Sequence, residues 1–246
     1  MAKTVPAHPD SAPLSPDATT AVLSEADLSL AAQIRSQKLT YLSERKLAAL
    51  AATCRLLETR AVPGAFIEAG CALGGSSILI ASVKATDRPL FVHDVFGMIP
   101  PPGEQDTPEV HARYQQIVDG QSKGIMGDRY YGYVADLQTV VRHNFERFGI
   151  RLEERSVSLV PGLVQDTLHP AGPVAFAHID VDWYDPVKTC LERIFPHLSV
   201  GGRIVLDDYN AWGGCLKATD EFLRSIPGQY RCDNSAGPMH IEKVRD

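Results

Sequence analysis

The sequence predicts an α/β protein whose mostly parallel β-sheet carries helices on both faces. Two observations point to this fold class. From residue 65 onward, short apolar runs alternate with segments of helical periodicity, and this alternation is typical of parallel strands joined by crossover helices. Two of the apolar runs, residues 174–179 and 203–206, are followed directly by aspartates. Because ligands of open parallel sheets bind outside the carboxyl ends of the strands, we expect the functional site there.

The chain of 246 residues divides into three segments. Residues 1–23 are rich in Pro, Ala, Ser, Thr and Asp, and we expect a flexible tail because such a segment buries little surface. Residues 24–60 predict two helices, over 24–38 and 43–59, the second with apolar residues at helical spacing. They precede the first strand and are interpreted as a lid or a dimer surface, so a homodimer or larger homo-oligomer is predicted. Residues 61–246 predict the sheet domain.

The sheet domain follows the chain break at Pro63 and Gly64. Its strands are expected at residues 65–70, 89–94, 157–160, 174–179 and 203–208, with one or two closing strands in 230–244. Its helices are expected at residues 75–84, 136–148, 186–198 and 213–226. The third helix is predicted to begin after a cap at Asp185 and to end before Gly201 and Gly202.

An insertion at residues 97–135 separates the second and third strands. This connection is longer than one crossover helix needs, and long loops of this kind are typically functional or disordered. It contains a candidate helix at residues 109–118 and a Gly-rich stretch with three tyrosines. We favour a substrate-facing loop over a solvated one. Five aromatic residues are candidates for the substrate site or for core packing: Tyr130, Tyr131, Tyr133, Trp183 and Tyr209.

The overall charge and composition argue against several classes of partner. The net charge is −6 and there is no long basic run, which disfavours nucleic-acid binding. No apolar run approaches the ~18 residues that span a membrane. The N-terminus lacks the pattern of a signal peptide, and the five cysteines form no C-x-x-C pair. A cytoplasmic protein with reduced thiols is therefore expected.

Four aspartates follow the two strands named first. Asp180 and Asp182 are two residues apart, so in an extended chain their carboxylates point the same way. Asp207 and Asp208 end the next strand. Carboxylates that converge repel one another unless a cation lies among them, and hard divalent cations prefer oxygen ligands. We therefore favour a metal site over the alternative, in which these residues only cap the following helices.

A Gly-rich turn follows the first strand, at residues 70–77. Gly70 and Gly74 would let a ligand approach the backbone at a helix N-terminus, although they are also compatible with a tight structural turn. The dinucleotide fingerprint G-x-G-x-x-G is incomplete, which disfavours NAD. Asp94 ends the second strand and suits the paired hydroxyls of a ribose. Glu68, before the turn, suits a cationic amino-acid end. This combination favours S-adenosylmethionine.

Four segments resemble the metal-dependent sugar O-methyltransferases of antibiotic biosynthesis, which include the macrocin and aminocoumarin-sugar enzymes. They are EAGCALGGSS at residues 68–77, FVHDVFGMIP at 91–100, HIDVDWYD at 178–185 and VLDDY at 205–209. The resemblance covers about residues 35–244 in matching order. It implies the Rossmann-like, seven-stranded sheet of a class I methyltransferase, with S-adenosylmethionine, a divalent cation (usually Mg²⁺) and a sugar hydroxyl as acceptor.

The resemblance also implies roles for individual residues. Asp180, Asp207 and Asp208 fall on metal-ligand positions, and Asp182 falls on the position proposed as the general base. The positions that bind the cofactor correspond to Glu68, Gly70, Gly74, Ser76, Asp94 and Asp180. The related catechol-type enzymes place a lysine three residues after the first metal aspartate, where this chain has Trp183. A lysine base is therefore excluded at that position.

Other residues and functions remain open from the sequence. His178 lies inside a strand and is interpreted as a buried histidine rather than the base, and His240 as a surface or packing residue. An alternative function is metal-dependent phosphotransfer or hydrolysis, but the chain has no G-x-x-x-x-G-K-[ST] motif to bind phosphate. Another is a non-catalytic nucleotide-sugar-binding module, which would not need an intact set of aspartates. The acceptor sugar, its carrier and the hydroxyl modified are not identified by the sequence.

Overall fold

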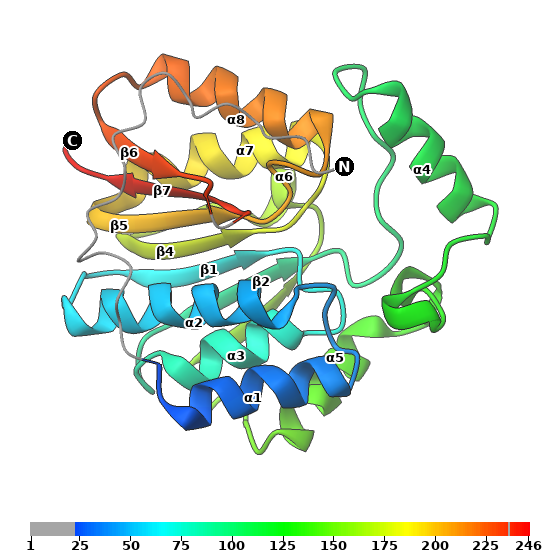
Figure 1. Ribbon diagram of the computed structural model, residues 1–246, viewed down its shortest axis with the longest axis horizontal. Coiled ribbons are helices and arrows are strands. Elements are labelled where there is room, and N and C mark those ends of the chain that lie inside the picture. The colour runs from blue at the N-terminus through cyan, green and yellow to red at the C-terminus, as the bar shows by residue number, and fades with distance from the viewer. Residues whose placement is uncertain (1–22, 236) are drawn as a thin grey trace.

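The computed structural model describes residues 23–235 and 237–246, so the predicted tail lies almost wholly outside the described residues. A seven-stranded sheet forms the centre, with helices on both faces (Figure 1). The strands are β1 (Ala65–Ala69), β2 (Leu90–Asp94), β3 (Val157–Pro161), β4 (Val174–Ile179), β5 (Leu198–Leu206), β6 (Tyr230–Asp233) and β7 (Met239–Lys243). The α-helices are α1 (Glu25–Ser36), α2 (Glu44–Thr59), α3 (Gly75–Val83), α4 (Pro108–Val118), α5 (Leu137–Arg147), α6 (Val164–Thr167), α7 (Tyr184–Ile194) and α8 (Gly213–Ser225).

The strand order is β3-β2-β1-β4-β5-β7-β6. Only β7 runs antiparallel to its neighbours within this sheet, so the predicted fold class is confirmed. The chain crosses from β3 at one edge to β4 beside β1, so the carboxyl ends of β1, β2, β4 and β5 lie next to one another. In such sheets the ligand site lies at this reversal of strand order.

Two predicted boundaries around α7 are wrong. The helix begins at Tyr184 with Trp183 as its N-cap residue, so Asp185 lies in the first turn and does not cap it. The glycines expected to end the helix lie inside β5, which begins at Leu198. A Cβ atom on Gly202 would lie 3.0 Å from the carbonyl oxygen of Ala175, and the pairing of β4 with β5 shifts register at this point. The glycine thus permits close strand approach.

The N-terminal helices pack on the sheet as part of its core. Ser24 and Asp27 form a capping box at the start of α1, and Asp27 also pairs with Arg55 of α2 at 2.8 Å. Apolar side chains of both helices belong to one buried cluster with Phe66 of β1 and Ile78 of α3. In Figure 1 these helices cover the same face as α3 and α5, while α6, α7 and α8 cover the other.

The insertion between β2 and β3 carries α4, which stands beside the layered core at one end of the sheet (Figure 1). Its first part is tied to the end of β4. The indole nitrogen of Trp183 donates to the Pro100 carbonyl at 2.9 Å, and Asp106 accepts from the backbone nitrogen of Tyr184 at 2.8 Å. Asp106 also accepts from Gly103 at 2.9 Å. None of the described helices is long and apolar enough to cross a membrane.

Candidate active site

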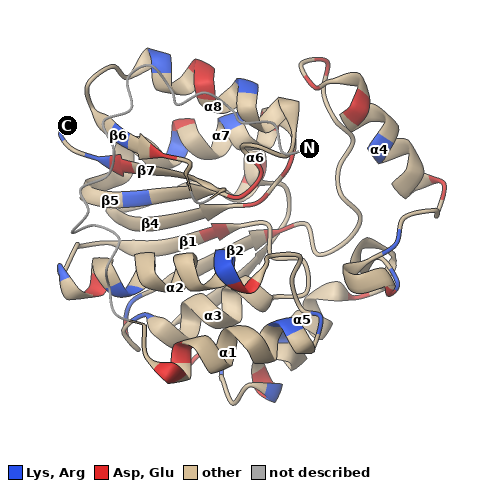
Figure 2. Cartoon of the chain, in the orientation of Figure 1, with Lys and Arg blue, Asp and Glu red and all other residues tan. Residues whose placement is uncertain are grey.

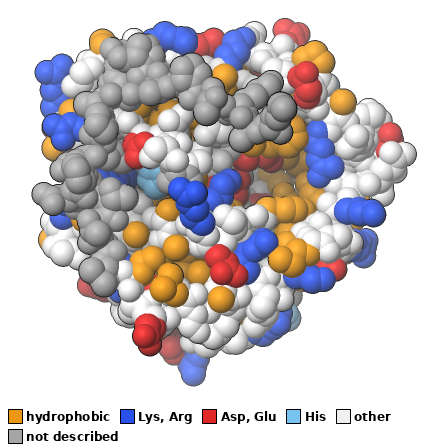
Figure 3. Space-filling view, in the orientation of Figure 1, with side chains coloured by type: hydrophobic (Ala, Val, Ile, Leu, Met, Phe, Trp, Pro, Cys, Tyr) orange, Lys and Arg blue, Asp and Glu red, His pale blue; other side chains and the backbone are white. Residues whose placement is uncertain are grey.

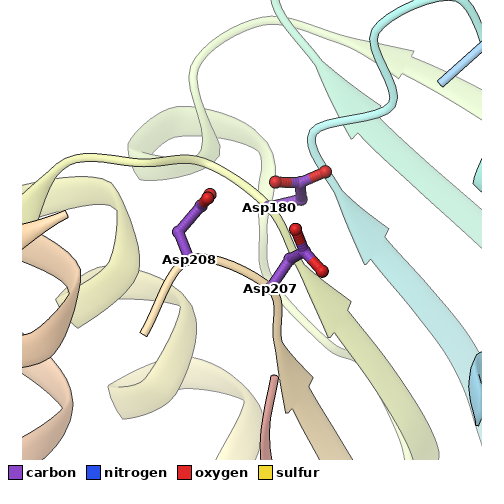
Figure 4. A group of neighbouring side chains, drawn as sticks. All are labelled: Asp180, Asp207 and Asp208. Carbon is purple, nitrogen blue, oxygen red and sulfur yellow. The ribbon is translucent and has the colours of Figure 1, made fainter. Parts of the chain in front are cut away.

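Three carboxylates point toward one another where β4 and β5 end (Figure 4). Asp180 follows β4, whereas Asp207 and Asp208 follow β5, and these strands are parallel neighbours. One oxygen from each of the three side chains lies within 4.8 Å of the others. In Figure 2, acidic segments follow these strands at the end of the sheet that faces α4. The sequence therefore folds these three residues into a group with the spacing of a cation site.

Asp182 also lies beside this group, but its backbone conformation is not the extended one that was predicted. Because β4 ends at Ile179, Asp182 is not one pleat beyond Asp180 in the same strand. Its φ of 56° lies in the left-handed region, which is rare for a residue other than glycine and is typical of functional sites. From this position its side chain reaches Asp208 and Trp212. The extended-strand reasoning was wrong, although the four aspartates do line one cavity.

The electrostatics of the group favour a bound cation. Burial, followed by the repulsion of Asp208, raises the pKa of both Asp180 and Asp182 well above the ordinary value. Two buried carboxylate oxygens, Oδ1 of Asp207 and Oδ2 of Asp208, have no hydrogen-bond partner among the described residues. A buried acceptor without a partner is costly, and a divalent cation would satisfy both oxygens. The residues present therefore fit such an ion.

Lys46 places a positive charge in contact with this group, and the sequence did not predict this contact. It lies in the first turn of α2, and its ammonium contacts Oδ2 of Asp207 at 2.8 Å. The two oxygens of the Asp207 carboxylate therefore have different surroundings. Oδ2 pairs with Lys46 of α2, whereas Oδ1 has no hydrogen-bond partner among the described residues. The segment before the first strand thus contributes directly to the site.

Replacing Lys46 with Met is expected to lower the melting temperature of the metal-free protein. The change removes a partly exposed cation beside four carboxylates, and ~1 kcal/mol of lost stability corresponds to about 2–4 °C. Thermal melts in EDTA test this. Lys38→Met is the control, because the Lys38–Asp128 pair lies on the surface, away from the aspartates. Equal melting of Lys46→Met and wild type would show that the contact stabilises nothing.

A first cavity lies beside the aspartates, at the ends of β1, β2 and β3. Its lining includes Gly70, Asp94 and Asp180, together with residues 162–165, which follow β3 and include the start of α6. Gly70 has a φ of 84°, and a Cβ atom there would collide with the Asp180 carbonyl oxygen. The carboxylate of Asp94 is held by the backbone nitrogens of Cys71 and Phe96, both at 2.7 Å. Burial raises its pKa.

Three residues predicted to bind the cofactor lie elsewhere. Glu68 is fully buried; it accepts a hydrogen bond from the Ser77 hydroxyl and contacts Nδ1 of His178 at 2.8 Å. Ser76 is buried in the first turn of α3. Gly74 has a φ of 87°, and a Cβ atom there would lie 3.0 Å from the Val141 side chain. None of the three belongs to the lining of the first cavity, so we interpret them as shaping the turn.

A second cavity shares seven lining residues with the first, namely Gly70, Asp94, Ile99, Tyr131, Asp180, Asp182 and Trp183. Its lining adds Asp207, Asp208 and residues from distant segments, among them Tyr41, Arg113, Ile117, Tyr130 and Trp212. The sequence singled out Tyr130 and Tyr131 but not Tyr41, Arg113 or Trp212, which come from three separate parts of the chain.

Four other candidates, two tyrosines and two histidines, lie outside the lining of both cavities. Tyr133 donates to the Ile117 carbonyl at 2.5 Å, and Tyr209 donates to Asp220 at 2.8 Å. Neither lines a cavity with the aspartates. His178 is fully buried, with Nδ1 on Glu68 and Nε2 without a partner among the described residues. His240 is buried in β7, where desolvation lowers its pKa to about 4.

Residues 19–227 match the model of one protein family, described as macrocin O-methyltransferase (TylF). The chain belongs to this family. A relative of the chain is the 8-demethyl-8-(2,3-dimethoxy-alpha-L-rhamnosyl)-tetracenomycin-C 4'-O-methyltransferase of Streptomyces olivaceus, which is 33% identical over 167 residues. That alignment covers 65% of this chain and 58% of the relative. The chain thus matches less than two thirds of the relative's length.

Solved structures support the fold of this family member. The O-methyltransferase NovP superposes with a TM-score of 0.70 at 23% identity, covering 87% of this chain and 88% of that chain. An O-methyltransferase from Bacillus cereus, solved in complex with SAH, superposes with a TM-score of 0.55 at 15% identity, covering 92% and 94% of the two chains. Such low identities show the fold of a class I methyltransferase and do not define an acceptor.

Proposed function

We propose that the chain is an S-adenosylmethionine-dependent O-methyltransferase that methylates a hydroxyl group of a sugar and uses Mg²⁺ or another divalent cation. One observation carries this proposal. Both cavities are lined by Asp94, the carboxylate suited to a ribose, and they share Asp180 and Asp182 of the aspartate group as a common wall. A methyl donor in one cavity and an acceptor in the other would meet at these two residues. Family membership and the activity of the tetracenomycin relative support the same reaction.

The first cavity suits S-adenosylmethionine, which supplies a methyl group on a positively charged sulfur. Each oxygen of Asp94 accepts one backbone hydrogen bond, so the carboxylate is fixed in orientation. Its remaining lone pairs are available to the two hydroxyls of a ribose. The glycine at position 70 lets the ligand lie against the backbone, and the acidic wall at Asp180 and Asp182 favours a cationic group.

Asp180, Asp207 and Asp208 would hold the divalent cation. Such an ion acts as a Lewis acid toward an acceptor oxygen, which is worth several kcal/mol for a poorly acidic sugar hydroxyl. Asp182 would accept the proton of that hydroxyl, because its carboxylate borders both cavities and is not one of the three grouped oxygens. The aromatic side chains of the second cavity would pack on the sugar and exclude water.

A methyl-transfer screen tests the proposed function directly. Labelled S-adenosylmethionine would be incubated with wild-type protein, Mg²⁺ and a panel of nucleotide-sugars, simple glycosides and glycosylated natural products. Labelled sugar, identified by mass spectrometry, is expected for at least one class of acceptor. Tight binding of NAD together with no binding of S-adenosylhomocysteine would contradict the proposal, because the first cavity would then serve a different cofactor.

Replacing Asp94 with Ala is expected to weaken the binding of S-adenosylhomocysteine by about tenfold or more, since a charge-assisted hydrogen bond is worth ~1.5–3 kcal/mol. Calorimetry measures this. Asp87→Ala, a change of the same type at a residue outside both cavities, serves as the control. Because Asp94 also orders the turn through Cys71, Asp94→Asn should be measured beside it. Wild-type affinity in both Asp94 variants would remove Asp94 from the cofactor site.

A further inference from the structure

The second cavity has a single cationic side chain among its described lining residues, Arg113 of α4. The rest of the lining consists of acidic, aromatic, aliphatic and small residues. Figure 3 shows acidic side chains in the depth of a hollow, hydrophobic side chains around them and basic side chains toward its rim. Arg113 is therefore a single positive charge among the described residues of a cavity that is otherwise acidic or uncharged.

Arg113 is partly buried, yet its guanidinium forms no hydrogen bond or ion pair with any residue that the structure describes. Other basic residues of the same region are engaged. Arg129 donates to the Tyr133 carbonyl at 2.5 Å, and Lys38 pairs with Asp128 at 2.8 Å. A guanidinium presents five donors in a fixed plane, and those of Arg113 are therefore available to a ligand that enters the cavity.

Neutralising the aspartates does not account for Arg113. The contact with that group comes from Lys46, which pairs with Asp207. The charge of Arg113 acts on the phenols of Tyr41 and Tyr130, whose pKa values burial raises and Arg113 lowers, with Asp182 acting in the opposite sense to Arg113. Arg113 enters the cavity from α4, whereas the aspartates follow β4 and β5, so the two charges come from different walls of the cavity.

We propose that Arg113 binds an anionic group of the acceptor, so that the sugar is methylated as a phosphate- or carboxylate-bearing compound. This inference rests on the proposed function and specifies its substrate class. An anion would be repelled from the aspartates and attracted to the guanidinium, whose planar donors match the oxygens of phosphate and carboxylate. The two sides of the cavity would thus orient the sugar, with its reacting hydroxyl toward Asp182 and its charge toward α4.

Calorimetry on protein saturated with S-adenosylhomocysteine and Mg²⁺ tests the inference. The probes are UDP-glucose, glucose 1-phosphate, glucuronate and uncharged methyl glucoside. At least one anionic probe is expected to bind about tenfold or more tightly than methyl glucoside, and Arg113→Met should abolish this preference. Arg113→Lys should retain part of it, because the charge remains. The pattern among the three anions distinguishes a nucleotide diphosphate, a simple phosphate and a carboxylate.

Arg151→Met is the matched control, since Arg151 is largely exposed and pairs with Glu154 on the surface. It should leave every affinity unchanged, and S-adenosylhomocysteine should bind equally to all variants. Equal binding of charged and uncharged probes, or an anion preference that survives Arg113→Met, overturns the inference. Methyl transfer separates the two proposals. Transfer to neutral glycosides that is unaffected by Arg113→Met contradicts the inference alone, whereas no transfer to any sugar despite Arg113-dependent anion binding contradicts the proposed function.

Discussion

The substitution Asp182→Asn is expected to reduce kcat by ~10²-fold or more, because it removes the proposed proton acceptor while keeping the shape of the side chain. The variant should bind Mg²⁺ and S-adenosylhomocysteine as wild type does. Its residual rate should rise with pH as hydroxide takes over the deprotonation. Single-turnover kinetics measure the chemical step, and calorimetry measures the two affinities.

Two other results would assign Asp182 a different role. A lower Mg²⁺ affinity, with the rate restored by excess Mg²⁺, would make Asp182 a ligand of the cation. Near wild-type activity would make it structural and leave the base to be found elsewhere, with the buried His178 and His240 as the next residues to test. Asp166→Asn, at an exposed position in α6, controls for the loss of one carboxylate and should change neither kcat nor affinity.

Removal of the divalent cation is expected to abolish turnover. EDTA should reduce methyl transfer to background and added Mg²⁺ should restore it, since the single ion pair of Lys46 with Asp207 leaves the other aspartates of the group without a cation to pair with among the described residues. Asp207→Asn should weaken Mn²⁺ binding, measured by electron paramagnetic resonance, while leaving S-adenosylhomocysteine binding intact. Asp207 suits this test better than Asp180, because Asp180 borders both cavities. Full activity in EDTA would rule out the metal-dependent mechanism.

The sequence predicted those features that depend on short-range pattern. Apolar runs ending in acid placed Asp94, Asp180, Asp207 and Asp208 at the carboxyl ends of β2, β4 and β5, where the structure has them. It missed Lys46, since a lysine in the first turn of an N-terminal helix is indistinguishable from a solvated one until the helix packs on the sheet. Tertiary packing, not local pattern, decides such contacts.

Glu68 was predicted to bind the cofactor, but it does not line the first cavity. A carboxylate beside a Gly-rich turn suggests a ligand, but its partner His178 lies 110 positions later in the chain and is its neighbour in the paired strands β1 and β4. Only the sheet register reveals that the two form a buried pair. The predicted strand position of Asp182 was wrong for a different reason. The site includes it through a left-handed backbone conformation, which an alternating pattern of side chains does not predict.

The hydrogen bonds of Trp183 and Asp106 divide the insertion into two parts, which differ in how far their sequences can change without disturbing the site. Residues 100–106 are held to the Asp182–Tyr184 turn by the indole of Trp183 and the backbone nitrogen of Tyr184, so substitutions there would displace the proposed base along with the loop. The helix α4 follows this anchored segment in the chain. It contributes Arg113 and Ile117 to the lining of the second cavity. New acceptor preferences can therefore arise in related chains by exchange of α4 residues, with the reacting groups left undisturbed.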